Sequence, residues 1–157
     1  MIQSILLTTN IRLILSVVVT IAVVYVLRSH IKDGLRPLQY GVIGLVTFTA
    51  FVHLISGAND YILFLNGMGY MALLLALYFV PLGNLARYQP WLYVAVIAYT
   101  VVTIVLYFVV HPWGLHAGTP DVLGWVTKVV EVVLIGALLI DLQQSRQSQP
   151  GLSKRLR

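Results

Sequence analysis

The residues best suited to bind iron or another metal are three histidines and one aspartate: His53, Asp60, His111 and His116. Imidazole is a common axial ligand of haem iron, and histidine with carboxylate oxygen suits zinc, copper or iron. His53 and His111 are expected in the same half of a membrane, so they are the candidate pair for one haem b. No short ligand spacing such as HxxxH occurs, and a histidine hydrogen-bonded inside a helical bundle accounts for His53 without a ligand.

Lys128 and Glu131 are the most costly residues in the sequence, because both interrupt a long apolar segment. A charge at the centre of a membrane helix costs ~2.5–3.5 kcal/mol on insertion scales. Their i, i+3 spacing places both side chains on one helix face, where they can pair. We expect an ion pair that fixes this helix in its bundle. A proton or ion relay and a contact with another subunit are the alternatives.

Several other polar residues are expected at the same depth as this pair, if helices rise by about 1.5 Å per residue. We therefore predict a polar chamber in the outer half of the membrane, shared by the second to fifth helices and lined by His53, Asn66, Tyr107, His111, Lys128 and Glu131. The inner half is expected to be much poorer in such groups. Thr49, His53 and Ser56 form one polar stripe on the second helix, which should face protein rather than lipid.

The composition indicates what kind of scaffold must position these residues. The chain has 157 residues, of which 59% are hydrophobic and 10% charged, whereas a soluble domain carries roughly 25% charged residues. Such a composition is typical of a multipass membrane protein. The absence of cysteine excludes disulfides, thiolate catalysis, iron–sulfur clusters and Cys-ligated zinc. No nucleophile–base constellation or Gly-rich phosphate loop occurs, which disfavours an enzyme.

Five apolar segments are each near the ~20 residues that span a bilayer, and only helices satisfy the backbone there. The sequence therefore predicts an all-α bundle of five transmembrane helices at roughly 11–29, 37–57, 61–81, 90–111 and 120–143. This domain covers 1–143 and is followed by a polar, basic tail at 144–157. The first segment is expected to be a retained helix rather than a signal peptide. Thr119, Pro120 and Asp121 are predicted to be the N-cap, a first-turn proline and a favourable first-turn acid.

The basic residues predict an orientation. Eight of the ten Lys and Arg residues lie in the first loop, the third loop or the tail, and in a chain with five spans these regions share one side. The positive-inside rule then places the N-terminus outside and the C-terminus inside. The net charge of +5 is therefore attributed to the membrane surface and not to nucleic acid.

Small residues are expected where helices approach closely, because they allow membrane helices to touch. We predict helix packing at Gly41 and Gly44 in the second helix and at Gly67 and Gly69 in the third.

The stretch HLISGANDYILFLNGMGYMALLLALYFVPL resembles an uncharacterised family of small multipass membrane proteins of bacteria and archaea. That family has a histidine before a small-residue turn and an LNGxGY-like third helix. The matching residues here are His53, Leu65, Asn66, Gly67, Gly69 and Tyr70. The resemblance implies no activity or cofactor. We expect a protein of the plasma (inner) membrane of a prokaryote.

The sequence is compatible with three candidate functions. The first is a structural or accessory subunit of a larger membrane complex, without catalytic chemistry, which contacts lipid and either other membrane subunits or copies of itself. The second is a haem- or metal-binding electron-transfer protein that uses the outer-half histidines. The third is a small oligomeric carrier, channel or receptor with an outward-facing polar pocket.

Overall fold

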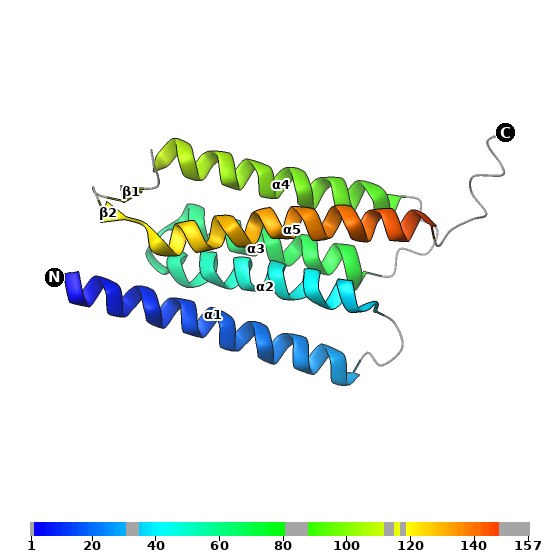
Figure 1. Cartoon of the computed structure of the whole chain (residues 1–157), viewed down its shortest axis with the longest axis horizontal. Coiled ribbons are helices and arrows are strands. Elements are labelled where there is room, and N and C mark those ends of the chain that lie inside the picture. The colour runs from blue at the N-terminus through cyan, green and yellow to red at the C-terminus, as the bar shows by residue number, and fades with distance from the viewer. Residues whose placement is uncertain (1, 31–34, 81–87, 112–114, 117–118, 148–157) are drawn as a thin grey trace.

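The computed structural model describes residues 2–30, 35–80, 88–111, 115–116 and 119–147, and in these ranges the chain forms a bundle of long helices (Figure 1). The helices are α1 (Ile2–His30), α2 (Pro37–Ser56), α3 (Tyr61–Tyr78), α4 (Gln89–Val110) and α5 (Val122–Gln147). A short 3-10 turn, η1 (Gly57–Asn59), joins α2 to α3. All five helices are long and apolar enough to cross a membrane. The predicted all-α class with five candidate spans is confirmed.

Two helices extend beyond their predicted limits. α1 begins at Ile2 rather than near residue 11, and α5 continues to Gln147 rather than ending near residue 143. The first residues of the predicted tail, from 144, are therefore helical. Residues 148–157 of that tail lie outside the described ranges.

The predicted start of α5 is wrong by two residues. Thr119 and Pro120 form the short strand β2, which pairs antiparallel with β1 (Leu115–His116). The capping residue is Asp121, because its Oδ1 accepts a hydrogen bond from the Gly124 amide at 3.0 Å. The Asp121 carbonyl also accepts from the Trp125 amide at 2.9 Å. The Asp121 side chain satisfies one of the free N–H groups of the first turn and its carbonyl accepts the first helical hydrogen bond, so the helix starts after it.

The helices run alternately up and down, which gives the bundle two ends. The Asp121 end holds the ends of α2 and α4 and the starts of α3 and α5, at the left of Figure 1. The Arg36 end holds the starts of α2 and α4 and the ends of α3 and α5. Helices α2 to α5 pack together, whereas α1 lies on the outside of the bundle and contacts chiefly α2.

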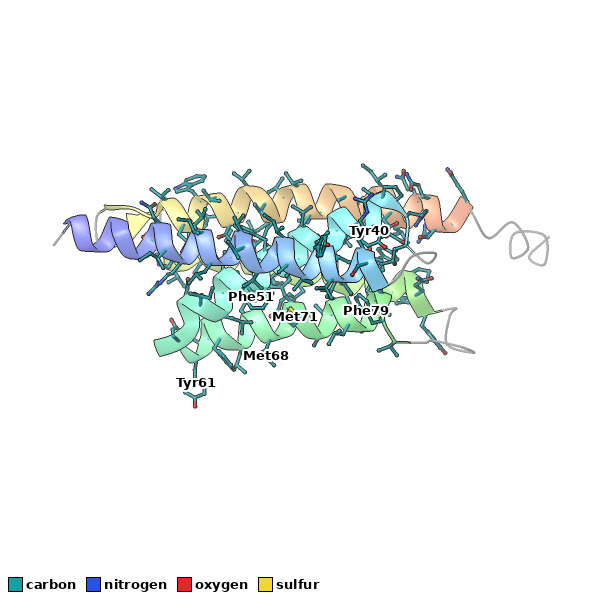
Figure 2. All side chains as sticks on the ribbon, turned by 90° about the horizontal axis from the view of Figure 1, so that it is seen from below. Tyr40, Phe51, Tyr61, Met68, Met71 and Phe79 are labelled. Carbon is teal, nitrogen blue, oxygen red and sulfur yellow. The ribbon has the colours of Figure 1, made fainter. Side chains whose placement is uncertain are left out.

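The core lies between α2, α3, α4 and α5. Buried aliphatic side chains from all four helices contribute to this core, and six of them are called the apolar layer: Ile43, Val46, Leu74, Val96, Leu134 and Leu138. The exterior is also apolar, as a lipid-facing surface requires. Figure 2 shows Tyr61 and Met68 on α3 pointing away from the bundle, and both side chains are exposed.

Glycines bring the helices close together at three of the four predicted positions. A Cβ added to Gly67 would lie 2.7 Å from the Ala50 carbonyl oxygen, so α2 and α3 are in backbone contact there. Gly69 faces the ring of Tyr99 on α4, and Gly44 faces α1. The prediction for Gly41 is wrong, because nothing lies within 4 Å of a Cβ at that position. Its side of α2 faces an apolar groove at the bundle surface.

Candidate functional site

Glu131 is at the centre of a buried cluster of ionisable side chains, the Glu131 cluster, which comprises His53, Lys128 and Glu131. The Lys128 ammonium is 2.6 Å from Glu131 Oε2, and Nε2 of His53 is 3.2 Å from Glu131 Oε1. Glu131 is completely buried and the two partners nearly so. The predicted pairing of Lys128 and Glu131 is confirmed. Pairing is physically required, because an isolated charge in a medium of low dielectric constant is too costly to retain.

His53 points into the bundle, as the polar-stripe prediction requires. Thr49, one turn earlier on α2, is completely buried as well. The imidazole lies parallel to the ring of Tyr70 on α3, with the ring centroids 6.0 Å apart. An apolar helix can retain this histidine because its partner is a buried carboxylate on α5, 78 residues later in the chain.

Two hydroxyl groups link the cluster to α3 and α4. Thr103 Oγ1 on α4 donates to the Thr100 carbonyl at 2.8 Å and lies 3.4 Å from Glu131 Oε2. It is also 2.9 Å from the Tyr70 hydroxyl. Because a threonine hydroxyl has one proton, which Thr103 directs to one of these acceptors, Tyr70 must be the donor in that third contact. Glu131 is thus connected, directly or through Thr103, to every core helix.

A line of polar groups leads from Lys128 to the Asp121 end. The Lys128 ammonium lies 5.3 Å from the centroid of the Tyr107 ring, a distance suited to a cation–π contact. The Tyr107 hydroxyl donates to Asp121 Oδ2 at 3.2 Å. The His111 ring stacks on the Tyr107 ring, with the two ring centroids 5.0 Å apart.

The six residues predicted to line a polar chamber are only partly brought together. His53, Lys128 and Glu131 touch one another, Tyr107 contacts Lys128, and His111 contacts Tyr107. Asn66 accepts a hydrogen bond from the Tyr99 hydroxyl at its backbone carbonyl, at 3.1 Å, and its buried side-chain oxygen has no hydrogen-bond partner among the residues that the structure describes. Sequence reasoning did not assign Tyr70, Thr103 and Asp121 to the site. The one available signal was that Tyr70 lies deep in an apolar helix and needs a hydrogen-bond partner.

The arrangement gives no support to the predicted haem or metal ligands. One ring nitrogen of His53, Nε2, is in contact with Glu131, and the His111 ring is stacked on Tyr107. Asp60 is exposed and caps α3, with Oδ1 2.9 Å from the Ile62 amide. The side chain of His116 lies outside the described residues. Across the part of the chain that the structure describes, no group of three or more His, Cys, Asp or Glu side chains is arranged to hold a metal ion.

A second polar cluster, the Asp141 cluster, lies at the Arg36 end and comprises Arg36, Tyr78, Tyr93 and Asp141. The completely buried carboxylate of Asp141 forms an ion pair with Arg36. Its Oδ2 accepts hydrogen bonds from the hydroxyls of Tyr78, at 2.7 Å, and Tyr93, at 2.5 Å. The expectation that this half of the bundle is poor in polar groups is therefore wrong. The anion there is stabilised because the start of α2, the end of α3 and the start of α4 each supply one of its three partners.

Arg36 is held in place by hydrogen bonds to both α2 and α5. Its backbone amide donates to Gln39 Oε1 at 2.9 Å, which caps the start of α2. Its guanidinium also donates to Ser145 Oγ at 2.7 Å on α5. The side chain is about one-third exposed, at 34%, so this ion pair reaches the edge of the bundle whereas the Glu131 cluster does not.

Five apolar helices, with charged side chains paired inside the bundle and aliphatic side chains outside, define a multipass membrane protein. Comparisons with protein-family models, curated proteins and solved structures give no match for this chain.

Proposed function

We propose that this protein is a structural or accessory subunit of a larger membrane complex, and that α1 is the helix that contacts its partner. The observation that carries the proposal is an unpartnered apolar seam on α1, comprising Ile11, Ile14, Val18, Ile21 and Tyr25. The spacing of these residues alternates between three and four. That is the pattern by which one helix packs along another in a coiled coil.

Contacts inside the chain use one side of α1, which packs chiefly against α2. Thr20 and Val24 meet Gly44 of α2 at ordinary van der Waals distance. The hydroxyls of Ser16 and Thr20 bond to carbonyls of α1 itself, at 2.9 and 2.7 Å. In a membrane, helix association depends on close packing, because lipid is as apolar as the helices are. A regular seam directed outward therefore favours a transmembrane helix of another subunit as its occupant.

Site-specific photo-crosslinking tests this proposal. A photoreactive residue at Ile21 should give a single recurrent protein adduct, and gently purified material should have a native mass well above 17.4 kDa. Val132 on α5 is the matched control, because the exposures are 63% for Ile21 and 59% for Val132. Lipid adducts alone at Ile21, with a monomeric native mass, would refute the proposal. A crosslinked dimer of this chain would replace the accessory role with self-association.

A second candidate function is a small oligomeric carrier, channel or receptor. The Glu131 cluster favours it, because ionisable residues inside membrane spans commonly mark a substrate or ion pathway. A stable homo-oligomer that retains a small molecule through purification would support this candidate over the first.

We also propose that the Asp121 end faces outward and the Arg36 end faces the cytoplasm, in the plasma membrane of a prokaryote. Arg28, Arg36 and Arg146 lie at the Arg36 end, whereas Arg12 lies toward the other end. Cytoplasmic loops carry the excess of Lys and Arg.

A further inference from the structure

We propose that the Glu131 cluster is a proton-binding site, in which His53 takes up the proton and exchanges it with the Asp121 end of the bundle. This inference is independent of the accessory role proposed above.

The contacts determine which atom accepts the proton. Lys128 and Glu131 at 2.6 Å form a pair with no net charge. A carboxylate next to His53 Nε2 requires that nitrogen to carry a hydrogen, because an imidazole nitrogen without one would repel it. Nδ1 of the neutral ring is then the free acceptor. Protonation there changes the net charge of the cluster from zero to +1 and places the Glu131 anion between two cations.

The surroundings favour a histidine that can hold either charge. The groups around the cluster are Thr49 on α2, Tyr70 on α3, and Tyr99, Thr103 and Tyr107 on α4, with Asp121 beyond Tyr107 at the start of α5. Thr49 Oγ1 is buried, lies one turn from His53 and has no hydrogen-bond partner among the side chains that the structure describes. The cluster is therefore surrounded by more polar groups than the Lys128–Glu131 ion pair itself uses as hydrogen-bond partners.

The polar line to the Asp121 end provides a route. Asp121, Lys128 and Glu131 recur at spacings of seven and three residues, so they lie along one face of α5. Tyr107 bridges the gap, with its ring against Lys128 and its hydroxyl on Asp121. In the other direction, the apolar layer follows Glu131 directly, since Leu134 and Leu138 on the same face of α5 are completely buried. This layer separates the Glu131 cluster from the Asp141 cluster, so exchange is expected from one end.

Nitrogen NMR of histidine-labelled protein in detergent tests the protonation site. Spectra recorded across a pH series should show the His53 imidazole with one protonated nitrogen at the high-pH end and two at the low-pH end. His53→Gln should remove that signal, and its amide N–H can still donate to Glu131, so loss of proton uptake is separated from loss of structure. His111→Gln is the matched control and should leave the titration unchanged. A His53 ring that keeps one protonation state over this series would overturn the proposal.

Stopped-flow proton uptake after a pH jump tests the route, with the uptake lost in His53→Gln taken as that of the site. Asp121→Asn should slow this uptake severalfold, because asparagine still caps α5 but no longer carries the entry carboxylate. Tyr78→Phe, which alters the Asp141 cluster at the other end, should leave the rate unchanged. If Tyr78→Phe slows uptake as much as Asp121→Asn does, the one-ended route is wrong.

Discussion

Glu131 and Asp141 are both completely buried on α5, and each is bound by side chains from other core helices. Their separation of ten residues corresponds to about 15 Å along the helix. Glu131 lies midway along the chain between Asp121 and Asp141, and Asp141 lies at the Arg36 end, with the apolar layer between the two carboxylates. Two polar connections at different depths fix both the rotation and the register of α5 against α2, α3 and α4.

Lys128 and Glu131 should depend on each other for stability. Glu131→Gln leaves a buried ammonium without its counter-charge, and removal of one partner of a buried pair costs ~3–5 kcal/mol. The double change Lys128→Met with Glu131→Leu should recover much of that loss, because it removes both charges together. Thermal unfolding in detergent measures both variants and the two single changes, Lys128→Met and Glu131→Leu. A double variant as unstable as the sum of the two single changes would show that the residues are not coupled.

Tyr93 should contribute more to stability than an exposed tyrosine. Tyr93→Phe removes a hydrogen bond of 2.5 Å to a buried carboxylate, and hydrogen bonds to charged groups are worth about 1.5–3 kcal/mol. Tyr25→Phe is the matched control, since that side chain is exposed on α1. Unfolding of both variants should show a clear loss for Tyr93→Phe and almost none for Tyr25→Phe. Equal losses would contradict a stabilising role for the Asp141 cluster.

Gly67 and Gly41 should respond differently to the same substitution. A methyl group at Gly67 meets the α2 backbone, 2.7 Å from the Ala50 carbonyl and 2.9 Å from the Leu54 amide, and overpacking costs about 1–3 kcal/mol. Gly41→Ala adds a methyl group in open space and should be neutral or slightly stabilising, because alanine favours helix. Denaturation in detergent compares the two variants. A Gly67→Ala protein as stable as Gly41→Ala would mean that α2 and α3 are further apart.

The proposed orientation is testable with single cysteines, since the chain has none of its own. Ala58→Cys lies at the Asp121 end and Gln147→Cys at the Arg36 end, and both positions are exposed. A membrane-impermeant maleimide should label intact cells at position 58 but not at 147, because positive loops stay inside. Permeabilised cells should label at both positions. The reverse pattern in intact cells would invert the assignment.

The number and type of the helices were predictable from the sequence because both depend on local properties. Segment length and hydropathy select membrane helices, and the i, i+3 spacing of Lys128 and Glu131 is enough to predict their pairing. The limits of α1 and α5 were harder to predict, because polar residues near a helix end can stay helical. At Asp121, hydrogen-bond geometry decided the start of α5.

The partners of the buried carboxylates were not predictable in the same way. The contact of His53 with Glu131 joins residues far apart in the chain and depends on how the helices are rotated. The burial of Asp141, by contrast, has a signal in the sequence. Asp141 follows Glu131, Leu134 and Leu138 at helical spacing, so one face of α5 continues from the first carboxylate to the second. The position of Asp141 near the end of an apolar run suggested a boundary, whereas its face indicated burial.

The placement of both carboxylates on α5 has a consequence for synthesis. Four residues that come earlier in the chain each have a carboxylate partner on the last helix: Arg36 at the start of α2, His53 on α2, Tyr78 on α3 and Tyr93 on α4. A nascent chain that has released α2, α3 and α4 into the bilayer must keep these groups solvated by water, lipid headgroups or a chaperone until α5 arrives. Incomplete chains therefore carry polar side chains inside the membrane whose carboxylate partners are still missing.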